Sequence, residues 1–189
     1  WLDAVCGADR WQVVLSRNRE GQLQGALPYY LKRKLGLSII SMPPFTDYTG
    51  PWIRLPEDNV LKRHRIYTIE NRILTDLIGQ LPATAFFDQQ YYPGFKNWLP
   101  FMWKGYRQTS YYTFHLDLNR PAEDIRAGFK GSVRTNIKKA ERSIIVSGSN
   151  EPGLLYELLE KSFALQGLSY PYSFETLALL FEALQKRGC

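Results

Sequence analysis

The chain has 189 residues, of which 44% are hydrophobic and 22% charged, and its 24 Lys and Arg against 18 Asp and Glu give a net charge of +6. This composition is typical of a globular protein with a substantial core. It argues against a membrane-spanning protein, because no run of about 18 apolar residues occurs. With only two cysteines, it also argues against a disulfide framework or a cysteine-based metal site. The two cysteines and the missing signal peptide suit a cytoplasmic protein. The positive net charge favours anionic binding partners such as nucleotides, RNA or an acidic membrane surface.

Hydrophobic periodicity and turn residues predict strands interleaved with helices. We expect strands over residues 11–15, 23–30, 37–41, 84–92, 106–118 and 143–147. We expect helices over residues 58–80, 94–104, 132–142, 150–166 and 173–187, and a short helix opening at Pro121. Because the pattern begins with an antiparallel hairpin that turns at 18–22, it predicts an α+β fold with a mixed, mainly antiparallel sheet and flanking helices.

The most informative segment is the helix expected at 132–142, with Ser132 as its N-cap. Three apolar side chains share one face of this helix: Val133, Ile137 and Ala140. Three cations follow one another along a different face: Arg134, Lys138 and Arg142. A helix anchored by its apolar face would aim these cations outward, close to free N–H groups at its start, which predicts a phosphate or carboxylate site. The alternative is an ordinary solvated basic face.

Motifs of several common enzyme classes are missing. There is no phosphate-binding Walker loop, no dinucleotide-binding glycine fingerprint and no Gly-x-Ser-x-Gly nucleophile elbow. The only histidines, His64 and His115, are expected to be solvated or structural rather than catalytic. The coenzyme A pyrophosphate loop of small acetyltransferases is also absent.

A set of short motifs nevertheless follows a familiar order. They are Ala26-Leu27-Pro28, the loop 43–52, the aromatic segment 97–105, the helix pattern Arg134-x-x-Ile137-x-Lys139-Ala140-x-Arg142, and the turn 166–174. In this order they resemble the Fem-type peptidoglycan aminoacyltransferases and the broader Fem/GNAT-like N-acyltransferases of the cell envelope. The resemblance covers nearly the whole chain.

This resemblance implies two GNAT-like subdomains in tandem. Residues 1–146 would form the first, and 147–189 would be the incomplete start of the second, opened by the helical pair. The implied reaction moves an acyl or aminoacyl group from acyl-CoA or aminoacyl-tRNA to an amine on a cell-envelope or nucleotide-sugar-linked substrate. It needs positioning and oxyanion stabilisation rather than a dedicated nucleophile, and no metal.

Five residues are the expected substrate contacts. Arg134 and Lys138 would bind the anionic part of the substrate, although Arg134 could instead form a salt bridge within the fold. Asp47 and Tyr48 would orient the acceptor amine, unless their loop is only a packed connector. Trp103 would line the cleft. The alternative is that both tryptophans of the aromatic segment, Trp98 and Trp103, fill the core.

Two other classes of function remain open. An RNA-binding module would use the net charge and the aromatic side chains for stacking, and it predicts salt-sensitive RNA binding. A non-catalytic ligand-binding domain predicts binding without transfer. For the enzyme, tRNA and the cytoplasmic membrane surface are additional candidate partners.

Overall fold

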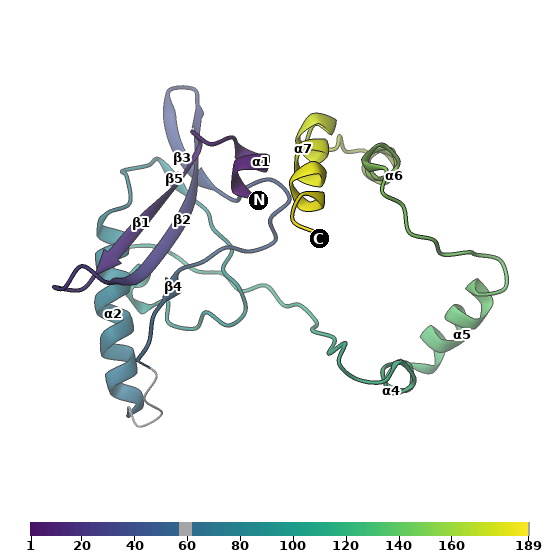
Figure 1. The fold of residues 1–189 in the computed structure, drawn as a ribbon, viewed down its shortest axis with the longest axis horizontal. Coiled ribbons are helices and arrows are strands. Elements are labelled where there is room, and N and C mark those ends of the chain that lie inside the picture. Colours follow the sequence, from purple (N-terminus) through teal and green to yellow (C-terminus); the bar gives the residue numbers. More distant parts are fainter. Residues whose placement is uncertain (57–61, 189) are drawn as a thin grey trace. The chain divides into compact units, whose positions relative to one another are not determined.

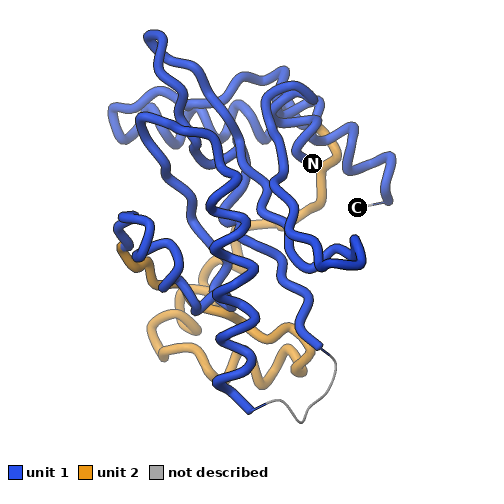
Figure 2. The backbone as a smooth tube through the Cα atoms, turned by 90° about the vertical axis from the view of Figure 1, so that its left-hand side faces the viewer, with its two compact units in different colours: residues 1–108, 152–189 blue, residues 109–151 orange. Residues whose placement is uncertain are grey.

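The computed structural model describes residues 1–56 and 62–188. These fall into two compact units (Figure 2): Trp1–Gln108 with Pro152–Cys189, called unit 1, and Thr109–Glu151, called unit 2. The expected boundary near residue 146 between two subdomains stays a prediction.

Unit 1 contains a mixed sheet (Figure 1). Its strands β1 (Trp11–Arg17), β2 (Leu23–Lys34) and β3 (Leu37–Ser41) form an antiparallel meander, and β4 (Trp52–Ile53) pairs antiparallel with β2. The remaining strand, β5 (Phe86–Phe87), lies parallel to β3. Asn18 stabilises the β1–β2 turn, because its side-chain oxygen accepts hydrogen bonds from the backbone N–H groups of Glu20 and Gln22. The expected mixed, mainly antiparallel sheet with flanking helices is confirmed.

The long helix α2 (Arg63–Gly79) supplies much of the core beside this sheet. It buries Ile73, Leu74, Leu77 and Ile78, in keeping with its predicted apolar face. Residues 58–61, where the helix was expected to begin, lie outside the described residues. Gly25 of β2 permits the close packing of α2, because a Cβ there would lie 2.4 Å from Cγ2 of Ile73.

A second small core joins both ends of the chain within unit 1. Helix α1 (Leu2–Cys6) contributes Val5 and Cys6, β2 contributes Tyr30, and α7 (Phe174–Gln185) contributes Leu180. Because these residues are buried together, α1 and α7 are held against the same end of the sheet.

The C-terminal helices agree with the sequence-based prediction. Ser173 caps α7, since its Oγ accepts from the backbone N–H of Thr176. The preceding helix, α6 (Pro152–Ala164), contacts α7 but leaves a set of leucines exposed, as expected for these helices: Leu154, Leu155 and Leu158. None of the helices in the described ranges combines the length and apolarity that a membrane crossing requires.

Several strand predictions are wrong. The strand expected at 84–92 is only β5, and residues 106–118 and 143–147 are irregular. Phe114 and Ile145 are almost fully exposed, so the alternating apolar residues find no sheet in unit 2 against which to pair. Alternation sets up an apolar face, but a strand is stabilised only by a hydrogen-bonded neighbour. Similarly, the helix expected at 94–104 is the short α3 (Leu99–Trp103).

Unit 2 consists of two short helices, α4 (Ala122–Ala127) and α5 (Gly131–Ala140), with extended flanks. An ion pair between Arg126 and Glu141 links the two helices. Neither helix contains a buried residue, so hydrogen bonds and the Arg126–Glu141 ion pair, rather than a core, hold this unit together.

Candidate functional site

The carboxyl ends of β3 and β5 lie at one edge of the sheet, because these two strands are parallel. Ile39 pairs with Phe86 and Ile40 with Phe87. In open α/β sheets, ligands bind outside the carboxyl ends of the parallel strands, and the β3–β5 pair provides one such edge in this mainly antiparallel sheet. This edge, with the segments 41–51 and 88–97 that follow the two strands, is therefore the candidate functional site, and we call it the strand-end site.

The two segments of the strand-end site are joined by their backbones at Thr49. The N–H of Thr49 donates to the carbonyl of Gln90 at 2.7 Å, and the N–H of Tyr92 donates to the carbonyl of Thr49 at 3.0 Å. Asp47 and Tyr48 directly precede this connection. Both are exposed, so the structure presents the predicted amine-binding pair to solvent next to the strand ends.

Three buried side-chain oxygens at this edge lack a hydrogen-bond partner among the described residues. They are Ser41 Oγ at the end of β3, and Gln89 Oε1 and Tyr91 Oη after β5. The amide nitrogen of Gln89 donates to the carbonyl of Pro28 at 3.1 Å, so only its oxygen is unpaired. Most buried polar atoms in proteins are paired, and each unpaired one costs stability. Ser41 pairs with Tyr30 of the small core beside α1 and α7, whereas Tyr91 packs against the core beside α2, so these two side chains face opposite sides of the sheet. Of the three, Tyr91 lies next to the loop of Asp47 and Tyr48, because it bridges Thr49.

Tyr91 lies within a cluster of aromatic rings. Its ring centroid is 5.0 Å from that of Phe95 and 5.4 Å from that of Phe101, and Tyr106 packs 5.6 Å from Phe101. Burial raises the pKa of the Tyr91 phenol well above its usual range, and the neighbouring phenol of Tyr106 adds to this shift. The phenol therefore keeps its proton and is available as a hydrogen-bond donor.

A pocket of about 490 Å³ opens beside the strand-end site. It is lined by the starts of β4 and α2 and by the segment after β5; its aromatic walls are Trp52, Tyr67, Tyr92 and Phe95. Gly50 permits one wall to close up, because its φ is +129° and a Cβ there would lie 3.0 Å from the Tyr92 ring. Asn97 anchors another wall by donating to Glu70 Oε2 and Asn71 Oδ1, both at 2.9 Å. The pocket can accept an apolar or ring-bearing ligand.

Trp103 was expected either in a cleft or in the core. It ends α3 with 60% of its surface exposed, so the core interpretation is wrong for Trp103. Trp103 is not among the residues that line the pocket of about 490 Å³, and neither are Asp47 and Tyr48. This pocket therefore does not unite Trp103 with the other two predicted contacts.

The cation pair Arg134 and Lys138 lies on α5 of unit 2. The helix starts at Gly131 with Lys130 as N-cap, so the expected Ser132 cap is wrong. Arg134 Nη1 donates to the carbonyl of Ala127 at 2.9 Å, which ties α5 to the end of α4. Lys138 is exposed. Arg134 thus has a structural contact, whereas Lys138 is accessible to an anion.

The apolar face that was expected to anchor α5 is only partly covered. Val133 is 42% exposed, and Ile137 and Ala140 are half-buried. Two short helices have too little surface to enclose these side chains. The position of the cations therefore depends on the α4–α5 hydrogen bonds and not on a buried face.

Sequence reasoning did not single out Ser41, Gln89 or Tyr91. Their position at the end of two apolar strands was visible, but the parallel pairing of these strands is a long-range feature. Among the described residues, no group of three or more His, Cys, Asp or Glu side chains could hold a metal ion. No family model matches the chain, and neither the curated proteins nor the solved structures include a match.

Proposed function

We propose that this chain acts as a Fem/GNAT-like N-acyltransferase, which moves an acyl or aminoacyl group from a thioester or tRNA donor to an amine on a cell-envelope or nucleotide-sugar-linked substrate. The observation that carries the proposal is at the strand-end site, where Tyr91, whose buried phenol is unpaired among the described residues, bridges to Thr49, directly after Asp47 and Tyr48. The antiparallel meander followed by α2 and the parallel β5 also supports a GNAT-like first subdomain.

The reaction requires few protein groups. The lone pair of the amine attacks the acyl carbonyl carbon, and the bond from that carbon to the donor sulfur or oxygen breaks. The amine nitrogen loses a proton and the leaving group gains one, so charge balances without oxidation. Asp47 is our candidate for holding the amine and accepting its proton, and the phenol of Tyr91 is our candidate donor to the developing oxyanion.

Substrate access to the Tyr91 phenol in this scheme requires a local opening at the bridge between Thr49 and Tyr91. The oxygens of Ser41, Gln89 and Tyr91 are buried, and the loop is connected to the segment after β5 through Thr49. Two backbone hydrogen bonds are a small barrier, since each contributes about 1 kcal/mol net. A ligand that forms hydrogen bonds with the unpaired oxygens would offset the loss of these two backbone hydrogen bonds.

The direct test is donor consumption by the chain. Acetyl-CoA would be incubated with a panel of amino sugars and amino acids, with release of the free thiol followed by a colorimetric reagent, and charged total tRNA would be tested in parallel for deacylation. We expect amine-dependent consumption of one donor. The variants Tyr91→Phe and Asp47→Asn should lower its rate by about 100-fold.

Matched controls separate this role from folding. Tyr29→Phe removes the phenol oxygen of a buried residue of β2, and Glu20→Gln neutralises an exposed carboxylate in the β1–β2 turn, at the opposite end of the sheet from Ser41; both should retain activity. If neither donor is consumed faster than in the absence of protein, the proposal is rejected. Tight, salt-sensitive binding of uncharged RNA without donor consumption would favour the RNA-binding alternative.

The contact of Lys138 with the anionic part of the substrate is a separate prediction. Lys138→Ala should weaken binding of a phosphorylated or nucleotide-linked substrate by about 10-fold, because a charge-assisted contact contributes about 1.5 kcal/mol. Lys139→Ala removes the same charge from the adjacent position and should have little effect. Equal weakening in both variants would point to net charge alone. Arg134→Ala is a poorer test, since it also breaks the contact with Ala127.

A further inference from the structure

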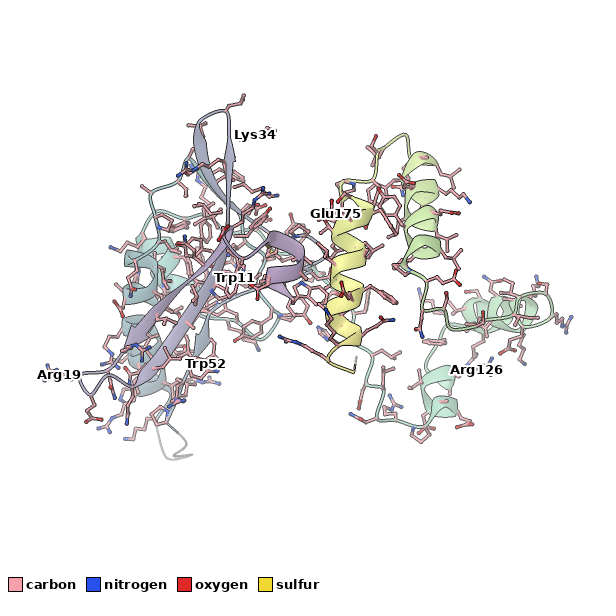
Figure 3. The ribbon with its side chains drawn as sticks, turned by 45° about the horizontal axis from the view of Figure 1, so that its top comes forward. Trp11, Arg19, Lys34, Trp52, Arg126 and Glu175 are labelled. Carbon is pink, nitrogen blue, oxygen red and sulfur yellow. The ribbon has the colours of Figure 1, made fainter. Side chains whose placement is uncertain are left out.

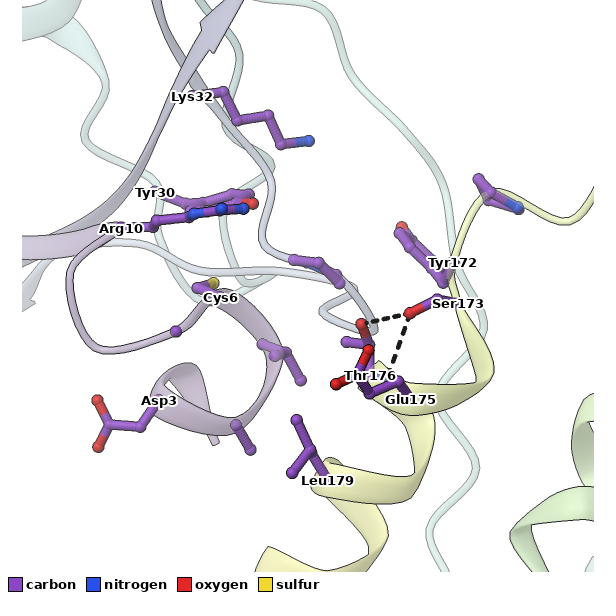
Figure 4. Close-up of a pocket in the computed structure, with 15 residues that line it drawn as sticks. Asp3, Cys6, Arg10, Tyr30, Lys32, Tyr172, Ser173, Glu175, Thr176 and Leu179 are labelled. Atoms are coloured by element: carbon purple, nitrogen blue, oxygen red, sulfur yellow. Dashed lines mark hydrogen bonds between the residues drawn. The ribbon is translucent and has the colours of Figure 1, made fainter.

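A second pocket of unit 1 shares one lining residue, Pro44, with the strand-end site but is otherwise formed by different segments. It has a volume of about 560 Å³ and lies between α1, β2 and the start of α7 (Figure 4). We call it the α1–α7 pocket. Its charged lining residues are Asp3, Arg10, Lys32 and Glu175.

One wall of the α1–α7 pocket is cationic. Arg10 and Lys32 lie there beside the buried ring of Tyr30 (Figure 4), and Lys32 Nζ is 5.0 Å from the centroid of that ring. Both cations are close enough to Cys6 to oppose the rise in the pKa of its thiol that burial causes. Neither forms a salt bridge with a described residue. Two neighbouring like charges without a counterion favour binding of an anionic group.

The opposite wall is polar and acidic. Ser173, Glu175 and Thr176 lie on the α7 side of the pocket in Figure 4. The Ser173 and Thr176 side chains hydrogen-bond to each other at 3.0 Å, and Glu175 has no salt-bridge partner within the described ranges. The remaining acid, Asp3, is already engaged, because its Oδ1 accepts from the Trp11 indole at 2.7 Å.

We propose that the α1–α7 pocket binds a small zwitterion with the chemistry of an amino acid. The ligand carboxylate lies between Arg10 and Lys32, and its ammonium group faces Glu175. A simple anion such as phosphate fits less well, because Glu175 lines the same pocket and repels it. This arrangement satisfies the unpaired charges of both walls with one ligand. The proposal does not depend on acyl transfer at the strand-end site.

The probes are the standard L-amino acids at millimolar concentration, tested with the whole chain by thermal shift and then by calorimetric titration. At least one should bind. Its methyl ester, which lacks the carboxylate, and its N-acetyl derivative, which lacks the ammonium group, should each bind about 10- to 100-fold more weakly. Binding by none of the amino acids would overturn the proposal.

Variants assign each end of the ligand. The double variant Arg10→Gln/Lys32→Gln removes the proposed carboxylate contacts, so in it the amino acid and its methyl ester should bind equally weakly. The variant Glu175→Gln removes the proposed ammonium contact, so in it the amino acid and its N-acetyl derivative should bind with equal affinity. Lys34→Ala is the matched control, since Lys34 carries the same charge at the tip of the β2–β3 hairpin (Figure 3) and should leave affinity unchanged.

Two results would refute this assignment. One is a variant that melts like the unmodified chain but keeps full discrimination between the ligand and its derivatives. The other is binding of inorganic phosphate that matches the amino acid and strengthens in Glu175→Gln, which would identify a simple anion site. If the double variant does not fold, Lys32→Gln alone supports the same comparison, because it removes one of the two carboxylate contacts.

Discussion

Replacing Tyr91 with Phe removes a single buried oxygen, and the structure predicts that this change stabilises the protein. Tyr91 Oη lacks a partner among the described residues, while its ring contacts with Phe95 and Phe101 are retained by Phe. A buried hydroxyl without a hydrogen bond costs about 1–3 kcal/mol, whereas in the unfolded chain it is solvated at no cost. Tyr91→Phe should therefore raise the free energy of unfolding by about 1 kcal/mol or more.

The assay is urea unfolding followed by tryptophan fluorescence, together with a melting curve. For a chain of this size, 1 kcal/mol corresponds to a rise in Tm of about 2–4 °C. Tyr29→Phe serves as the comparison, because its hydroxyl donates to Gln12 Oε1 at 2.5 Å and its loss should lower stability by about 1 kcal/mol. The two substitutions remove the same atom and should have effects of opposite sign.

A loss of stability in Tyr91→Phe similar to that in Tyr29→Phe would refute the reasoning, since it would show that the Tyr91 hydroxyl has a partner in solution. If the variant is more stable and also less active, the unpaired phenol is retained for function at the expense of stability. Greater stability with unchanged activity would leave the folding argument intact and remove Tyr91 from the proposed reaction.

Three further predictions concern packing, helix capping and pH. Gly25→Ala should destabilise the protein by about 1–3 kcal/mol, because its Cβ would lie 2.4 Å from Ile73 Cγ2; a near-normal urea midpoint would mean that α2 shifts freely. Ser173→Ala should cost about 1 kcal/mol through loss of the hydrogen bond to the Thr176 N–H, and an unchanged melting curve would contradict this role. Burial raises the pKa of the Cys6 thiol from 9.0 to about 11. Since the folded-state pKa is the higher one, the contribution of this thiol to stability is present below pH 9 and is lost as the pH rises to about 11. The difference in unfolding free energy between the unmodified chain and Cys6→Ala, measured in urea with reductant, should therefore fall across this interval, and a flat difference would show that the thiol is not desolvated.

The sequence was sufficient where structure depends on near neighbours. The β1–β2 hairpin was expected from alternating apolar residues around the 18–22 turn, and Asn18 closes it with local hydrogen bonds. The apolar face of α2 and the Ser173 cap of α7 were likewise correct, because each depends on side chains within a few residues.

The same reasoning failed for residues 106–118 and 143–147, whose strand-like alternation finds no partner in unit 2. It also misplaced the start of α5, where Lys130 rather than Ser132 is the N-cap. Which residue caps a helix depends on the direction from which the preceding chain enters. Here the hydrogen bond from Arg134 to the carbonyl of Ala127 helps to set that direction. Local propensity is thus overridden when the neighbouring element sets the geometry.

The sequence by itself determined the α+β class, the hairpin, the long helix and the loop of Asp47 and Tyr48, because periodicity and turn chemistry are written in consecutive residues. Only the tertiary structure decided that β5 lies parallel to β3 and that Tyr91 bridges Thr49, next to Asp47 and Tyr48. The tertiary structure also placed α1 beside α7, from opposite ends of the chain. Both features depend on strand pairing and burial between segments far apart in sequence, and no local pattern encodes which partner a strand or helix will meet.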